Sequence, residues 1–198
     1  MRRVVVTGLG TINPLGNNVS ASWDSLVHSK SGISKITKFE VDNYPCKIAG
    51  SIDDNTIDQE IVSQRDQRKI DRFITLGLIA ADEAVKDSGF VSNSENSFRA
   101  GVMVGSGIGG LDTIYKNSSI LDNQGIRKIS PFFIPSSLIN LLSGHISIKY
   151  NLKGPNSSPV TACATGTHAI GDSFTIIKNN KADLMVCGGA EAAICPLG

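Results

Sequence analysis

The sequence predicts an α/β fold, because short apolar runs alternate with stretches that have helical periodicity. Five runs have the length and composition of buried strands: residues 4–6, 47–49, 101–104, 158–160 and 184–187. Short strands that are apolar throughout are typical of a sheet covered by helices on both faces. No internal repeat or low-complexity tract interrupts this pattern. We therefore expect residues 1–198 to form one layered α/β domain.

Helical periodicity is clearest in residues 68–88, where apolar side chains recur every three to four positions and Gly89 supplies a stop. Three further helices are predicted: residues 19–30 behind the N-cap Asn18, residues 135–150 with proline in the first turn, and residues 163–178 ending at Asn179. The Ser- and Asn-rich residues 87–99 are expected to form a surface loop rather than a domain boundary.

Composition excludes several classes of partner. The 198 residues carry 19 Lys and Arg against 18 Asp and Glu, so no bulk charge attracts the chain to nucleic acid or membrane. No apolar stretch approaches the roughly 18 residues of a membrane span. The apolar run at the N-terminus breaks at Thr7 and Gly8, well short of a secretory core. We expect a cytoplasmic protein whose charged partners are met locally.

The cysteines and histidines do not form a metal-binding pattern. The chain has four cysteines and three histidines: Cys46, Cys163, Cys187, Cys195, His28, His145 and His168. None of the cysteines forms a C-x-x-C pair, so a structural zinc site is not expected, and a reducing compartment would keep the thiols free. The sequence predicts no metal and no cofactor.

Cys163 is the candidate nucleophile. It lies between an apolar run and the start of a predicted helix, with small residues on both sides in the segment 159–168. A thiol at such a turn meets unpaired N–H groups at the positive end of the helix dipole, which favours the thiolate. The same N–H groups can hold an oxyanion, and the small neighbours leave room for an acyl group. The alternative is a small buried cysteine that only packs.

A glycine-rich segment offers a different interpretation. Residues 105–110 (GSGIGG) follow a predicted strand and match the G-x-G-x-x-G pattern of dinucleotide-binding turns. No acidic residue ends a recognisable second strand at the expected distance, and glycine-rich turns after strands are common. A tight turn that packs closely against a neighbouring loop or a substrate is the preferred interpretation, and a dinucleotide site is the alternative.

The order of motifs resembles the first half of the 3-oxoacyl-[acyl-carrier-protein] synthases of the second elongating type. Six motifs carry the resemblance: residues 4–10 (VVVTGLG) with 13–16 (NPLG), 67–73 (QRKIDRF), 105–110 (GSGIGG), 154–156 (GPN), 159–168 (PVTACATGTH) and 188–191 (GGAE). The resemblance implies a thiolase-like fold layered α-β-α-β-α, built from two similar halves and assembled as a homodimer. It also implies a role in fatty-acid elongation. The implied partner is acyl carrier protein, which carries the acyl and malonyl groups as phosphopantetheine thioesters.

The resemblance also assigns roles to individual residues. It gives Cys163 the acyl-accepting role, places Ile108 where the acyl pocket is lined or gated, and places Phe133 where the pocket floor is closed from the opposite subunit. Five basic residues match positions that face the acidic carrier: Arg65, Arg68, Lys69, Arg127 and Lys128. Taken alone, such charges would more often form a solvated face.

The second half of the family's catalytic set is not found in these residues. The family uses two histidines, a lysine and a phenylalanine loop that follow the part matched here. His168 lies five residues after Cys163, which turns it about 140° away around a helix. Three hypotheses follow: a truncated condensing enzyme, a non-catalytic protein that binds acyl groups or the carrier, and the dinucleotide-binding domain. The first is favoured.

Overall fold

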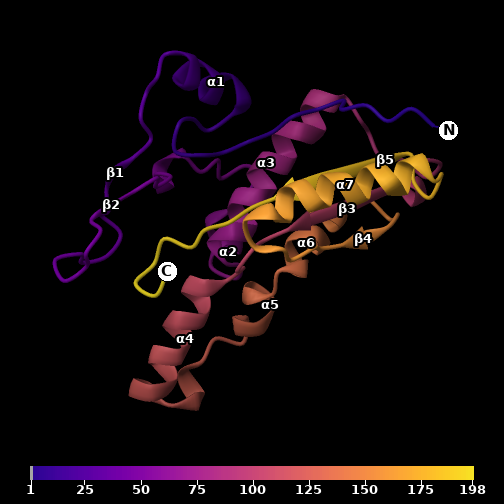
Figure 1. Ribbon diagram of the computed structural model, residues 1–198. Coiled ribbons are helices and arrows are strands. Elements are labelled where there is room, and N and C mark those ends of the chain that lie inside the picture. Colours follow the sequence, from indigo (N-terminus) through magenta and orange to yellow (C-terminus); the bar gives the residue numbers. More distant parts are fainter. Residues whose placement is uncertain (1) are drawn as a thin grey trace.

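The computed structural model describes residues 2–198 as an α/β unit with a parallel sheet at its centre (Figure 1). The α-helices are α1 (Val19–Val27), α2 (Gln64–Gln67), α3 (Arg72–Ser88), α4 (Leu111–Gln124), α5 (Phe133–Ser137), α6 (Asn140–Tyr150) and α7 (Thr165–Lys178). The strands are β1 (Ser34–Lys35), β2 (Ile48–Ala49), β3 (Ala100–Gly105), β4 (Asn156–Ser157) and β5 (Leu184–Gly189). Strands β1 and β2 pair antiparallel in a small separate sheet.

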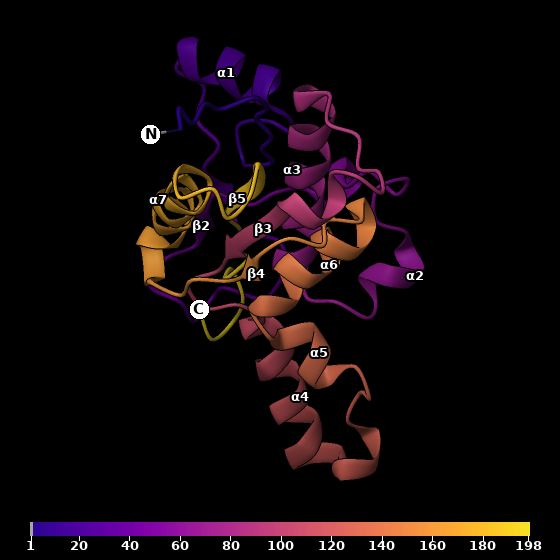
Figure 2. The ribbon, with the colours of Figure 1, turned by 90° about the vertical axis from the view of Figure 1, so that its right-hand side faces the viewer.

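The central sheet has the order β4-β3-β5, with both pairings parallel. Strand β3 is buried along its whole length, as its continuous apolar sequence predicts. Figure 2 shows α7 against one face of the sheet, with α3 and α6 on the other. The core lies on the α3 and α6 side, where Phe73, Ile74, Leu142 and Ile146 are fully buried against Val102. The predicted covering of both faces is confirmed.

The helix expected over residues 68–88 begins later, at Arg72. Asp71 caps α3, because its carboxylate accepts a hydrogen bond from the Phe73 amide at 3.1 Å. The same carboxylate accepts from the Thr113 hydroxyl at 2.6 Å, a bond that joins α3 to α4. The backbone at Asp71 is therefore extended, and the preceding turn forms the separate helix α2. The predicted end of α3 at Gly89 is confirmed.

The helix expected over residues 135–150 is also divided, into α5 and α6. Leu138 has an extended backbone between them. The Ser137 hydroxyl donates to the carbonyl of Phe133 at 2.9 Å. This side-chain bond gives a carbonyl of α5 a partner where the helix ends. The strand expected at residues 158–160 pairs instead at Asn156–Ser157. Pro159 has no N–H to donate to a ladder, which stops the strand before it.

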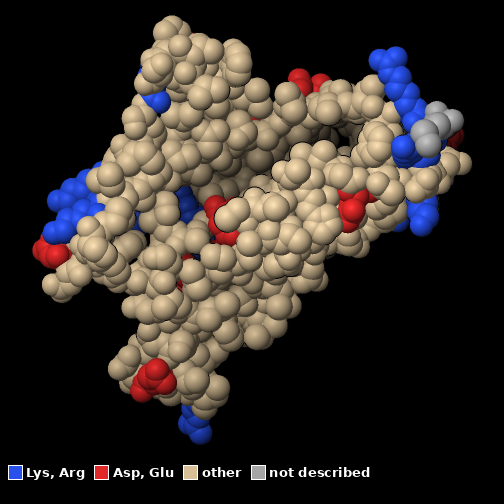
Figure 3. Space-filling model, in the orientation of Figure 1, with Lys and Arg blue, Asp and Glu red and all other residues tan. Residues whose placement is uncertain are grey.

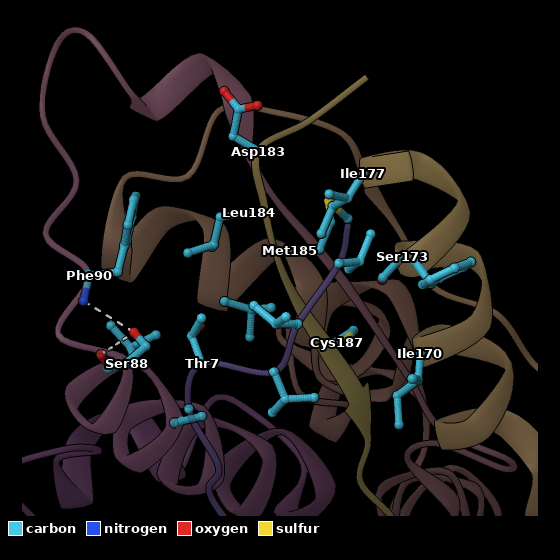
Figure 4. A pocket seen from close by; sticks show the side chains of 18 of the residues that line it. Thr7, Ser88, Phe90, Ile170, Ser173, Ile177, Asp183, Leu184, Met185 and Cys187 are labelled. Carbon is cyan, nitrogen blue, oxygen red and sulfur yellow. Dashed lines mark hydrogen bonds between the residues drawn. The ribbon is translucent and has the colours of Figure 1, made fainter. Parts of the chain in front are cut away.

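The predicted opening strand at residues 4–6 is wrong for this structure. Val6 is 77% exposed, and the segment forms no ladder with the sheet. Two glycines draw the chain onto α3 instead: a Cβ on Gly8 would lie 2.2 Å from the Ala84 carbonyl oxygen, and one on Gly10 would lie 1.9 Å from that of Ala80. A cavity of about 370 Å³ is lined by residues 2–8 together with residues of α3, α7 and β5 (Figure 4).

The strand predicted at residues 47–49 is found as β2, but it lies in the small separate sheet and Ile48 is exposed, so the prediction of a buried strand there is wrong. The helix predicted over residues 19–30 is found as α1, which ends at Val27. Asn18 caps α1 through a 2.7 Å hydrogen bond from the Ala21 amide. Residues 89–99 form a loop that ends in a short 3-10 turn before β3. Within residues 2–198, no helix combines the length and apolarity that crossing a bilayer would need.

Candidate active site

Cys163 lies in a single 3-10 turn, Ala162–Ala164, immediately before α7, and its side chain is exposed. Ala162 has a positive φ of 50°, a conformation rarely adopted by residues other than glycine. Thr165 holds the turn in place: its hydroxyl donates to the Ala162 carbonyl at 2.8 Å and accepts from the Thr161 amide at 2.9 Å. The strained turn therefore presents the thiol outward at the start of the helix.

The surroundings of Cys163 suit a nucleophile. The thiol stands two residues before α7, whose 14 residues direct the positive end of their dipole toward it. Cys187 lies on β5 instead, where burial raises the pKa of its own thiol, opposed by the Ser173 hydroxyl. A group that must attack as a thiolate is better placed at the exposed helix start than in the sheet.

The glycine-rich turn at residues 105–110 packs directly on the turn that carries Cys163. A Cβ on Gly107 would lie 3.0 Å from the Ala162 carbonyl oxygen and 3.1 Å from a carboxylate oxygen of Glu191, so only glycine fits without displacement. Glu191 accepts a hydrogen bond from the Ile108 amide at 2.9 Å. The Ile108 amide, which would have to donate to a diphosphate in a dinucleotide site, thus already donates to a carboxylate. This argues against the dinucleotide interpretation. The preferred interpretation, a tight turn in close packing, is confirmed.

Ile108 lies in the glycine-rich turn, and Phe133 lies in the adjoining helix α5. The Ile108 side chain is 52% exposed, and it follows the glycine that contacts the turn of Cys163. Phe133 is half-buried at the first position of α5. The Gly110 amide donates to the Ser137 carbonyl at 3.2 Å and joins the glycine turn to α5. Ile108 is therefore next in sequence to the glycine that contacts the turn of Cys163, whereas Phe133 begins the neighbouring helix α5.

The basic residues around α2 form the first of two groups. Arg65 lies within α2 and Arg68 follows its last residue, both exposed. Lys69 makes a 3.7 Å ion pair with Asp66, and its ammonium group lies 5.8 Å from the centre of the Phe132 ring. This contact links α2 to the loop before α5.

The second group, Arg127 and Lys128, stands in a 3-10 turn (Ile126–Lys128) after α4. Figures 1 and 2 show the end of α4 projecting away from α2. Figure 3 shows basic and acidic side chains at this projecting tip and few charges on the surface between it and the body. The structure therefore places the five predicted carrier-facing residues on two separate elements rather than in one cluster.

None of the three histidines contacts the thiol. His168 lies on the exposed flank of α7, 3.2 Å from the Thr161 hydroxyl and 3.1 Å from the Asp172 carboxylate, as its spacing from Cys163 predicts. His145 is half-buried in α6, where burial lowers its pKa, opposed by the charge of Asp66. His28 is the C-cap of α1.

Sequence reasoning missed the role of Glu191. The carboxylate also accepts from the Ser106 hydroxyl at 3.1 Å, and Ser106 in turn accepts from the Gly109 amide at 3.1 Å. These partners are more than 80 residues away along the chain. The GGAE motif at residues 188–191 places a charged residue two positions after the half-buried strand β5, but it does not show which partner that residue meets. Only the sheet register brings that residue to the turn.

Sequence comparison gives the family of this chain. A family described as "Beta-ketoacyl synthase, N-terminal domain" matches residues 1–198, so the chain belongs to the beta-ketoacyl synthases. It is 49% identical over 198 residues to the 3-oxoacyl-[acyl-carrier-protein] synthase 2 of Coxiella burnetii, covering all of this chain and 47% of that protein. It is 46% identical over 197 residues to the enzyme of the same name from Vibrio harveyi, with the same coverage of both chains. The chain spans about half the length of the curated relatives it matches.

Solved structures agree with this family and with the fold. A ketosynthase solved in complex with the acyl-carrier protein of a type II polyketide synthase, and bound to a hexaketide, aligns with a TM-score of 0.76 at 27% identity. That alignment covers all of this chain and 52% of the ketosynthase. The ishigamide ketosynthase/chain length factor aligns with a TM-score of 0.85 at 23% identity over 99% of this chain and 49% of that one. The chain therefore has the α/β fold of one half of a thiolase-like ketosynthase.

Proposed function

We propose that this chain supplies the nucleophilic half of a 3-oxoacyl-[acyl-carrier-protein] synthase, with Cys163 as the acyl acceptor. The observation that carries this proposal is the exposed thiol at the start of α7, on a strained turn packed against the glycine-rich turn. The relatives that cover the whole chain at up to 49% identity bear the name of this synthase. We take residues 1–198 as its N-terminal domain.

In the first step, the Cys163 thiolate attacks the carbonyl carbon of an acyl group held as a thioester on the phosphopantetheine arm of acyl carrier protein. The carbonyl oxygen becomes an oxyanion, which N–H groups at the start of α7 stabilise. Collapse of this tetrahedral intermediate breaks the bond to the carrier sulfur, and the carrier leaves as a thiolate that takes a proton from solvent. The product is an acyl thioester on Cys163.

In the second step, malonyl carrier loses carbon dioxide and its enolate carbon attacks the acyl thioester, which releases Cys163 as a thiolate and gives 3-oxoacyl carrier. This step needs donors that stabilise the enolate oxygen. No histidine of residues 2–198 reaches the thiol, and these residues correspond to 47% of the Coxiella burnetii relative. We infer that groups from outside these residues complete the second step.

Acyl carrier protein is the proposed partner, as in the type II polyketide ketosynthase that aligns with this chain. Arg65, Arg68 and Lys69 at α2, with Arg127 and Lys128 beyond α4, would face its acidic surface and act mainly on association rate. Ile108 would border the acyl chain, and Phe133 would close the pocket of a second subunit in a homodimer. The four free cysteines fit the reducing cytoplasm.

The test uses the natural protein that contains these residues, with octanoyl carrier as acyl donor. Release of the carrier thiol in a single turnover should fall to background in Cys163→Ala. Cys46→Ala is the matched control, because Cys46 is also an exposed thiol. Carrier binding should change little in either variant. Undiminished thiol release in Cys163→Ala would refute the proposal, whereas binding without acylation in the unmodified protein would favour the non-catalytic carrier-binding alternative.

A further inference from the structure

Glu191 is placed at the glycine-rich turn by the pairing of β3 with β5. Gly105 is aligned with Gly189 at the ends of the two strands, and the Ala190 amide then donates to the Gly105 carbonyl at 3.0 Å. The next residue is Glu191, so its side chain meets the turn that follows Gly105. Glu191 thus lies two residues beyond the end of β5, and the pairing of β5 with β3 brings it to the turn.

The Glu191 carboxylate holds the turn at two points. One oxygen accepts from the Ile108 amide at 2.9 Å, and the other accepts from the Ser106 hydroxyl at 3.1 Å. Ser106 is almost fully buried, and its hydroxyl accepts from the Gly109 amide. Ser106 therefore links the Glu191 carboxylate to Gly109 on the other side of Ile108. Hydrogen bonds to a charged acceptor are about twice as strong as neutral ones. Both sides of Ile108 are thus fixed by one carboxylate.

We propose that Glu191 is a positioning residue for the acyl site, whose carboxylate fixes the turn at residues 105–110 and thereby sets how far Ile108 restricts the acyl chain beside Cys163. Gly107 lies between the Glu191 carboxylate and the Ala162 carbonyl, so a shift of the turn changes the space next to the thiol. This inference rests on the acyl transfer proposed above and adds to it a determinant of acyl-length selectivity.

Four variants separate positioning from simple stability. Glu191→Ala removes both acceptors. Glu191→Gln keeps the shape and one acceptor oxygen, but its amide nitrogen cannot accept from Ser106. Ser106→Ala removes one arm and leaves the bond to Ile108. Glu83→Ala is the control, because the Glu83 carboxylate on α3 also accepts from two backbone amides, those of Thr11 and of Val19 at the start of α1, each at 2.9 Å.

The experiment measures acylation of Cys163 in the natural protein from butanoyl, octanoyl and palmitoyl carriers, with thermal unfolding of each variant beside it. In Glu191→Ala, the ratio of long-chain to short-chain acylation rates should change by about fivefold or more, since two charged hydrogen bonds are lost. Glu191→Gln and Ser106→Ala should change it by less. Glu83→Ala should lower the melting temperature and leave the ratio unchanged.

Two results would overturn the inference. If Cys163 is acylated but the ratio stays the same in Glu191→Gln and Ser106→Ala as well as in any folded Glu191→Ala, the carboxylate has only a structural role and the proposed function stands. If the unmodified protein is not acylated at Cys163, the proposed function and the inference fail together.

Discussion

The two helical layers of the sheet differ in how completely this chain buries them. Nine of the 17 residues of α3 are buried, whereas only Thr165, Ala169 and Ser173 are buried among the 14 residues of α7. On α7, Ile170 and Phe174 remain 55% and 45% exposed. The α3 side is a finished core made by residues 2–198, and the α7 side presents both the thiol and unburied apolar surface. The well-buried core and the exposed thiol therefore lie on opposite faces of one sheet.

The largest effect is expected from a cavity on the α3 side. Phe73→Ala removes a side chain with no exposed surface and should lower the free energy of unfolding by about 3–5 kcal/mol. Phe174→Ala on α7 should cost less than about 1.5 kcal/mol, because that ring is already partly in water. Urea denaturation of both variants checks the difference, and equal losses would show that the two faces are equally packed.

A smaller effect is expected from the polar link between α3 and α6. The Tyr150 hydroxyl donates to Asp82 at 2.6 Å, and Lys86 pairs with the other carboxylate oxygen at 2.6 Å. Burial raises the pKa of Asp82, but the bonds from Lys86 and Tyr150 outweigh it and leave the pKa below its ordinary value. The stabilisation that the ionised Asp82 carboxylate contributes is therefore present above about pH 4. It is lost as the pH falls through the pKa of Asp82 in the folded protein.

Removing the Tyr150 hydroxyl tests that link. Tyr150→Phe should lower the free energy of unfolding by about 1–2 kcal/mol at neutral pH and should move the acid loss of stability to higher pH, because Asp82 loses a donor. Tyr115→Phe is the control, since no hydrogen bond of the Tyr115 hydroxyl is found among residues 2–198. Urea titrations between pH 3 and pH 7 give both quantities. An unchanged pH profile would mean that Tyr150 does not contribute to the pKa of Asp82.

Substitutions at the exposed apolar residues of α7 should have the smallest effect on folding stability. Their effect should instead be on self-association. Because Ile170 and Phe174 are exposed, the isolated 198 residues should self-associate. Phe174→Glu should shift sedimentation velocity profiles toward the monomer. Val91→Glu, at an exposed apolar residue on the loop after α3, should not. A monomeric unmodified chain would contradict this account of the α7 face.

The sequence predicted what depends on local pattern. The buried strand β3, the cap at Asn18, the stop at Gly89 and the turn of Cys163 all follow from residues adjacent to one another. The prediction from sequence failed where contacts with residues far along the chain determine whether and where an element forms. The Asp71 cap that breaks the helix before α3 also accepts a bond from the Thr113 hydroxyl, 42 positions away. The opening strand at residues 4–6 was lost because Gly8 and Gly10 bring the chain onto α3.

The candidate site divides in the same way. Cys163 could be found from its small neighbours and the helix that follows it, while Ile108, Phe133 and the five basic residues came from resemblance alone. Glu191 could not be assigned, because nothing local indicates that the end of β5 meets the turn after β3. Its contacts exist only once the two strands are in register.

The most direct test is to locate the acyl group itself. The natural protein is incubated with octanoyl carrier and digested, and the peptides that contain the four cysteines of residues 2–198 are examined by mass spectrometry. We predict an octanoyl thioester on Cys163 and none on Cys46, Cys187 or Cys195. Acylation at another cysteine, or at none, would contradict the assignment of Cys163 as the acyl acceptor.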